Sequence, residues 1–122
     1  MASVEHFEIP VDNLERAQGF YNKLFGWQFK TENFGGFEYT FIQTKENEQE
    51  TGIHGGMMKR QCPEQKTLAY IGVDSIDETL KQIQESGGKV LLSKSEVEGA
   101  GFMAVCLDTE NNSFGLWENA RK

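Results

Sequence analysis

Apolar residues recur at every second position along two short stretches of the chain that lie 62 positions apart. Every second position of Phe7–Val11 is apolar, and the same holds for Ala69–Val73. A period of two places the apolar side chains on one face of an extended strand. The surrounding sequence repeats as well, because Ile9–Glu15 aligns with Ile71–Asp77 with three of seven pairs identical. The chain is therefore predicted to contain two copies of one structural unit.

A short amphipathic helix is predicted after each of these strands. Asp12 and Asp74 stand where a helix N-cap is expected, each with an acidic residue three positions later. Gly26 and the pair Gly87–Gly88 follow the helical patterns and predict the ends of both helices. The apolar stripes have helical spacing and comprise Leu14, Ala17, Tyr21, Leu24 and Phe25 in the first copy and Ile76, Leu80 and Ile83 in the second.

Beyond each helix the pattern predicts three further strands, separated by turn-forming glycine and asparagine residues. These strands are expected over 27–34, 37–44 and 51–59 in the first copy and over 89–93, 102–108 and 113–118 in the second. The unit is therefore βαβββ, twice. We predict an α+β fold in a single domain, residues 1–122, with module one at about 4–59, a linker at 60–66 and module two at about 67–118.

Composition excludes several classes of function. The 122 residues carry a net charge of −7, which argues against binding to a nucleic-acid backbone. No apolar run approaches the roughly 20 residues that a membrane span needs, and the first residues do not resemble a secretion signal. The two cysteines, Cys62 and Cys106, form no metal-binding or disulfide pattern. We expect a cytoplasmic protein with no nucleic-acid or membrane partner.

Several ordered motifs resemble one superfamily. Pro10–Ala17, followed by Phe20–Tyr21 and Leu24–Trp27, is similar to the first module of glyoxalase/bleomycin-resistance/extradiol-dioxygenase proteins, also called the vicinal oxygen chelate (VOC) superfamily. Gly52–Gly56 and the closing Leu107–Glu118 are similar to it too. The resemblance covers essentially the whole chain. It implies two βαβββ modules that form a curved eight-stranded sheet around an open cup, and it implies a homodimer.

The resemblance also implies two alternative activities. Many members hold a divalent metal in the cup and act as lyases, isomerases or dioxygenases on vicinal oxygens of a substrate, whereas others bind a small organic molecule without chemistry. Fold alone does not choose between them.

The family's metal-ligand positions are only partly filled in this chain. His6 matches the ligand position on the first strand, but the repeat aligns it with Leu68, which cannot bind a metal. The position on the last strand falls on Gly115, and its counterpart in the first copy falls on Ile53, next to His54. His6 and His54 are thus weak metal candidates, and a divalent metal stays possible rather than certain. A one-residue shift that would bring His54 in also moves it to the opposite face of the strand.

We predict ligand binding by four residues on the cup faces of their strands: His6, Glu8, Tyr70 and Trp117. Glu8 shares a face with His6 and could act as a general base, could orient the imidazole, or could be a solvated carboxylate. Tyr70 and Trp117 could contact the ligand or belong to the core. The leading hypothesis is a small-molecule-binding protein with an incomplete metal site, and the alternative is a metal-dependent lyase, isomerase or dioxygenase.

Overall fold

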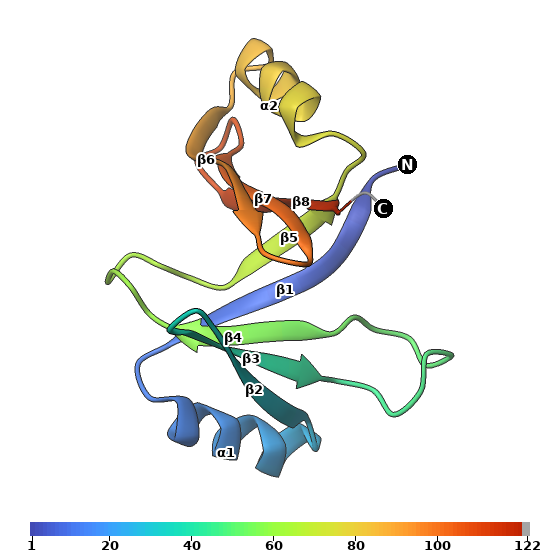
Figure 1. The fold of residues 1–122 in the computed structure, drawn as a ribbon, viewed down its shortest axis with the longest axis vertical. Coiled ribbons are helices and arrows are strands. Elements are labelled where there is room, and N and C mark those ends of the chain that lie inside the picture. Colours follow the sequence, from blue (N-terminus) through green and yellow to red (C-terminus); the bar gives the residue numbers. More distant parts are fainter. Residues whose placement is uncertain (121–122) are drawn as a thin grey trace. The chain divides into compact units, whose positions relative to one another are not determined.

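The computed structural model of the protein describes residues 1–120 and contains eight strands and two helices in the order βαβββ–βαβββ (Figure 1). The first half contains β1 (Ser3–Val11), α1 (Leu14–Phe25), β2 (Gln28–Phe34), β3 (Phe37–Gln43) and β4 (Gly55–Lys59). The second half contains β5 (Leu68–Gly72), α2 (Ile76–Glu85), β6 (Lys89–Val97), β7 (Gly101–Leu107) and β8 (Ser113–Asn119). The predicted fold class, two βαβββ modules with eight strands, is confirmed.

Residues 6–67 form one compact unit. Its strands are hydrogen-bonded in the order β2-β3-β4-β1, with β1 and β4 parallel and the other neighbours antiparallel. One face of these strands packs against α1, which lies along them in Figure 1. The core between helix and sheet is built around Val11, Ile42 and Met57, with the rings of Phe7, Tyr21 and Trp27 packed against it.

Residues 1–5 and 68–120 form the second unit, so that the start of β1 groups with the second module. Its strand order is β1-β5-β8-β7-β6, with β5 and β8 parallel. The helix α2 packs on one face over Ile76, Ala104, Cys106 and Leu116, all of which are fully buried or nearly so. Burial raises the pKa of the Cys106 thiol, as expected for an inert core cysteine.

The predicted N-caps, Asp12 and Asp74, are wrong by one residue. The caps are Asn13, whose side chain accepts a hydrogen bond from the backbone N–H of Arg16, and Ser75, which accepts one from Glu78. Each predicted cap is followed by a second residue of the cap-forming class, and the backbone enters the helix after the second one. Asp12 instead forms an ion pair with Arg60, with 3.1 Å between Oδ1 and Nε.

The last strand of the first module begins later than predicted, at Gly55 instead of residue 51. The preceding residues form a loop in which the hydroxyl of Thr44 donates to the carbonyl of Ile53. This loop also changes the spacing between the repeats. Gly56 pairs with Glu8 and Gly115 pairs with Tyr70, so Gly115 corresponds to Gly56 and not to Ile53. Within residues 1–120, neither helix has the length and hydrophobicity of a membrane span.

Candidate functional site

Three polar side chains of the first unit form a continuous chain of hydrogen bonds. His6 Nε2 lies 2.9 Å from the hydroxyl oxygen of Tyr39, and the Tyr39 hydroxyl donates to Glu8 Oε2 over another 2.9 Å. His6 and Glu8 come from β1 and Tyr39 comes from β3, and all three side chains are half-buried. We call these three residues the polar cluster.

The polar cluster lies on the face of the sheet opposite α1. Phe7 and Ile9 of β1 pack into the core beneath the helix, so the alternate residues His6 and Glu8 point the other way. The predicted pairing of His6 and Glu8 on the face away from the helix is therefore found in the structure. What the sequence reading missed is the tyrosine that joins them, 33 and 31 residues away along the chain.

Tyr39 reaches β1 because the strand between them carries a glycine. β4 separates β3 from β1, and the ring of Tyr39 crosses it directly over Gly56. A Cβ atom on Gly56 would lie 2.5 Å from Cε2 of Tyr39 and closer still to Cζ and the hydroxyl oxygen. On the opposite face, Gly55 receives the ring of Phe7 in the same way, with a hypothetical Cβ 2.5 Å from its Cζ. The two glycines therefore accommodate one ring on each face of the strand.

The hydrogen bonds define the protonation of the cluster. Burial, followed by the nearby charge of His54, lowers the pKa of His6, so its imidazole is neutral near pH 7. The Tyr39 hydroxyl has one proton and donates it to Glu8, so His6 must donate its own proton to the tyrosine oxygen. The proton of His6 therefore resides on Nε2, and Nδ1 is the acceptor nitrogen.

Phenylalanine side chains extend the same face beyond the polar cluster. Phe37 and Phe41 flank Tyr39 on β3 at alternate positions, and Phe34 on β2 pairs with Phe37. The ring centroids of Tyr39 and Phe41 are 5.2 Å apart, and those of Phe34 and Phe41 are 6.2 Å apart, both edge to face. Phe34, Phe37 and Phe41 retain 42%, 45% and 41% of their accessible surface. We call these three residues the phenyl shelf.

The ring of His54 forms hydrogen bonds with residues outside the polar cluster. It lies in the loop before β4, where Nδ1 accepts from the backbone N–H of Thr44 at 3.2 Å and Nε2 lies 3.1 Å from Glu48. Both ring nitrogens therefore make polar contacts within the segment that leads into β4. The Glu48 carboxylate, which bonds His54 and Lys45, has its pKa lowered by these partners.

The donor set does not fit the divalent metal that the resemblance raised as possible. A catalytic metal generally uses about three protein ligands. Among the described residues, no group of three His, Cys, Asp or Glu side chains converges. The polar cluster offers two candidate ligands, His6 and Glu8, and the structurally equivalent positions Gly56 and Gly115 have no side chain to contribute.

In the second unit, Tyr70 and Trp117 lie on the face opposite α2. Tyr70 is 4% exposed, and its ring covers Gly115 as Tyr39 covers Gly56. The indole N–H of Trp117 donates to Asn119 Oδ1 at 2.8 Å. Both residues occupy the face predicted from the strand period, and a role of either in ligand binding stays a prediction.

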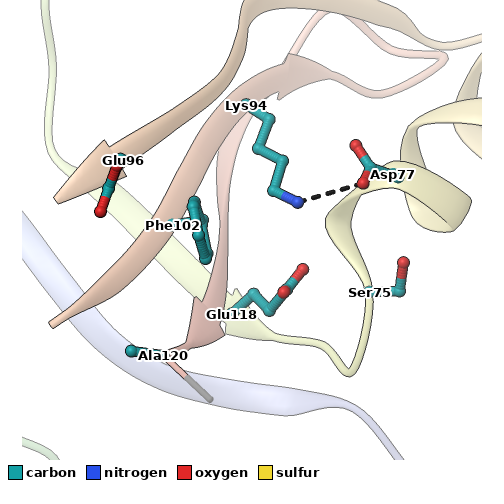
Figure 2. Close-up of a pocket in the computed structure, with 7 residues that line it drawn as sticks. All are labelled: Ser75, Asp77, Lys94, Glu96, Phe102, Glu118 and Ala120. Atoms are coloured by element: carbon teal, nitrogen blue, oxygen red, sulfur yellow. Dashed lines mark hydrogen bonds and ion pairs between the residues drawn. The ribbon is translucent and has the colours of Figure 1, made fainter. Parts of the chain in front are cut away.

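A hollow at the beginning of α2 lies on the other face of that unit (Figure 2). Glu118 points to the helix N-terminus, and its Oε1 accepts the backbone N–H of Ile76 at 2.8 Å. Lys94 spans the hollow, forming an ion pair with Asp77 at 3.0 Å and lying over the ring of Phe102. These contacts satisfy the helix terminus within the protein, so Glu118 stabilises the fold.

One signal in the sequence could have revealed Tyr39. Phe37, Tyr39 and Phe41 alternate along a predicted strand, and Gly55–Gly56 follows in the next one. A glycine in a strand interior often marks the close approach of another group. Which ring fills the space depends on strand order and register, and these are not encoded in the local pattern.

The chain is similar in sequence to glyoxalase-related proteins. A family model described as "Bleomycin resistance protein-like N-terminal" matches residues 4–45. A glyoxylase-like domain-containing protein of Didymella fabae is 29% identical over 90 residues, covering 72% of this chain and 70% of its own. A Mycobacterium bovis protein with the name "Putative glyoxylase CFP32" is 29% identical over 110 residues, covering 86% of this chain. The match spans only 41% of that mycobacterial protein.

Solved structures share the fold at lower sequence identity. The protein BH1468 of Bacillus halodurans has a TM-score of 0.72 at 14% identity, covering 99% of this chain and 96% of its own. Methylmalonyl-CoA epimerase of Mycobacterium tuberculosis has a TM-score of 0.71 at 12% identity, covering 97% and 88%. The chain therefore shares the fold of these structures, and its sequence is similar to bleomycin-resistance-like and glyoxylase-like proteins.

Proposed function

We propose that the chain binds a small organic molecule on the face of the first unit that carries the polar cluster. The observation that supports this most directly is the hydrogen-bonded series His6–Tyr39–Glu8, half-buried and bordered by phenyl rings. Small-molecule sites typically combine apolar walls with a few convergent polar groups. The polar groups of the ligand would lie against the Glu8 carboxylate and the His6 imidazole. In the second unit, Tyr70 and Trp117 are proposed as ligand-binding residues.

A second function, metal-independent proton transfer, is favoured by one feature of the cluster. The Glu8 carboxylate accepts a hydrogen bond from the Tyr39 hydroxyl, so a base and a weak acid lie within one hydrogen-bond length of each other. Such a pair can remove a proton from a substrate and supply one to it. The fold neighbours named methylmalonyl-CoA epimerase make this worth testing, although their likeness is one of fold. The metal-dependent lyase or dioxygenase alternative has less support than proton transfer, because the polar cluster offers only two candidate metal ligands, His6 and Glu8.

The binding proposal is tested by ligand-observed NMR with a fragment library on the intact chain. We expect fragments whose affinity falls at least about tenfold in Glu8→Gln and Tyr39→Phe, which is the effect of losing one charge-assisted hydrogen bond. Glu38→Gln is the matched control, because Glu38 is an exposed carboxylate beside Tyr39 on the other face of β3. Fragments that bind all three variants as tightly as the original chain would contradict the proposal.

Proton transfer is tested by incubating the chain with methylmalonyl-CoA in deuterated water and following exchange by mass spectrometry. Exchange that is lost in Glu8→Gln and retained in Glu38→Gln would establish this activity. Absence of exchange, together with fragment binding at the polar cluster, would establish the binding function alone.

We also propose that the protein works as a homodimer in the cytoplasm. The resemblance to VOC proteins supports the dimer, and the reduced, unpaired cysteines Cys62 and Cys106 fit the compartment.

A further inference from the structure

We propose that the outward face of α1 is the contact surface for a second copy of the chain, with the two α1 helices antiparallel and crossing at Gly19. This inference rests on the homodimer proposed above and names the surface through which it forms. Three features of the face carry it: exposed apolar side chains, a glycine that no contact within the chain requires, and charges placed symmetrically around that glycine.

Two large apolar side chains stand on the outward face of α1. Leu14, Ala17 and Tyr21 pack against the core of the unit. Phe20 and Leu24, in contrast, are 57% and 56% exposed. They are four residues apart, so they lie next to each other along the helix. A contiguous apolar patch, unlike a single exposed side chain, is typical of an interaction surface.

Gly19 adjoins this patch in the middle of the helix. Glycine is less favourable than alanine inside a helix, because it loses more backbone freedom on folding. A Cβ atom at Gly19 would have no neighbouring atom within 4 Å, so no contact within the chain requires a glycine here. Because it lacks a side chain, this point of the helix is open to close approach by a second helix.

The charges beside Gly19 are placed so that two copies of the face attract each other. Glu15 and Lys23 lie four residues before and four residues after Gly19, and residues four apart share one side of a helix. When two such helices cross antiparallel at Gly19, Glu15 of each copy faces Lys23 of the other. Among the described residues, neither side chain forms an ion pair or a hydrogen bond, so both are available for this pairing.

The net charge of the chain also favours this face for self-association. A chain that carries −7 repels a second copy wherever two acidic surfaces meet. The outward face of α1 instead holds two basic residues, Arg16 and Lys23, and one acidic residue, Glu15. An anionic membrane would attract the same two cations but repel the chain as a whole. Two helices whose rows of residues four apart interdigitate form the commonest packing of helices in globular proteins.

Disulfide cross-linking of the full chain tests the crossing point. Gly19→Cys is made together with Cys62→Ser, because Cys62 is the exposed native thiol and Cys106 is buried. Two cysteines at the crossing point of a symmetric pair come within disulfide distance, so oxidation with copper–phenanthroline should give a cross-linked dimer. Lys81→Cys in the same background is the control, since Lys81 is exposed on α2, and it should remain monomeric on a non-reducing gel.

Charge reversal tests the pairing of Glu15 with Lys23, with the dimer Kd measured by sedimentation equilibrium. Lys23→Glu should raise the Kd by about 5–30-fold, because two attractive pairs become two repulsive ones. Adding Glu15→Lys to the same chain restores opposite charges and should return the Kd towards its original value. Lys81→Glu is the matched control for the change in net charge, and circular dichroism checks that each variant is folded.

The outcomes separate this inference from the proposals on which it rests. A Kd that changes equally in Lys23→Glu and Lys81→Glu, or a dimeric chain in which Gly19→Cys does not cross-link, would overturn the α1 interface and leave the homodimer in place. A monomer at micromolar concentration would overturn both. Binding of a monomeric chain to phosphatidylserine vesicles that is lost in Phe20→Ser would assign the face to a membrane instead. The fragment screen tests ligand binding independently of these results.

Discussion

Replacing Gly56 with alanine should disrupt the polar cluster through one added methyl group. The new Cβ would lie 2.5 Å from Cε2 of Tyr39 and nearer to its Cζ and hydroxyl oxygen, so the ring cannot keep its position across β4. If the ring moves, both 2.9 Å hydrogen bonds of the Tyr39 hydroxyl are lost. The bond to the Glu8 carboxylate contributes about 1.5–3 kcal/mol and the bond to neutral His6 about 0.5–1.5 kcal/mol.

The expected cost is therefore about 2–4.5 kcal/mol of unfolding free energy, and strain from overpacking alone would account for about 1–3 kcal/mol. Urea denaturation followed by circular dichroism measures this directly. Gly19→Ala is the matched control. Gly19 lies inside α1 with no atom within 4 Å of a new Cβ, so alanine there should stabilise the protein by up to about 1 kcal/mol.

A double-mutant cycle tests the reason for the cost. In a Tyr39→Ala background the obstructing ring is gone, and Gly56→Ala should then cost less than about 1 kcal/mol. If Gly56→Ala is equally destabilising in both backgrounds, Tyr39 is not what the glycine accommodates. If it costs under about 0.5 kcal/mol in the original chain, the ring is free to move and the cluster is not rigid.

Three other outcomes are expected. Glu118→Ala should lower the unfolding free energy by about 1–3 kcal/mol in urea denaturation, because the N–H of Ile76 loses its buried acceptor. Asp74→Ala should have an effect near zero, since Ser75 is the N-cap. Equal effects of the two variants would contradict the observed capping. Because the pKa of His6 is lowered in the folded chain, the unfolded chain binds more protons below about pH 6.5, and stability should fall as pH decreases through that range. His6→Gln should flatten this dependence of stability on pH. A steeper dependence in the variant would refute the reasoning. Light scattering should give twice the 13.8 kDa chain mass, and a monomer at micromolar concentration would exclude the dimer.

The sequence predicted the elements well because their signals are local. The period of two placed His6 and Glu8 on one face of β1, and helical spacing located α1 and α2. Cap positions were missed by one residue because Asp12–Asn13 and Asp74–Ser75 each offer two adjacent cap-forming side chains. The preference between them depends on where the backbone turns, which composition alone does not decide.

The candidate site was predicted only in part because its central contact is long-range. Tyr39 meets Glu8 across β4, and this requires a strand order in which β4 lies between β3 and β1. The repeat offset also misled the comparison of the last strands. A longer loop before β4 shifts its register relative to β8, so that Gly56, and not Ile53, is the counterpart of Gly115.

At its two adjacent glycines, β4 separates two aromatic rings by little more than the backbone of the strand. The ring of Phe7 presses on one side at Gly55, and the ring of Tyr39 presses on the other at Gly56. A larger residue at either position would push on only one side, so the fold core and the polar cluster can be altered separately by changes one residue apart. This dipeptide is therefore where an engineer could loosen the ligand-facing surface while leaving the helix packing unchanged.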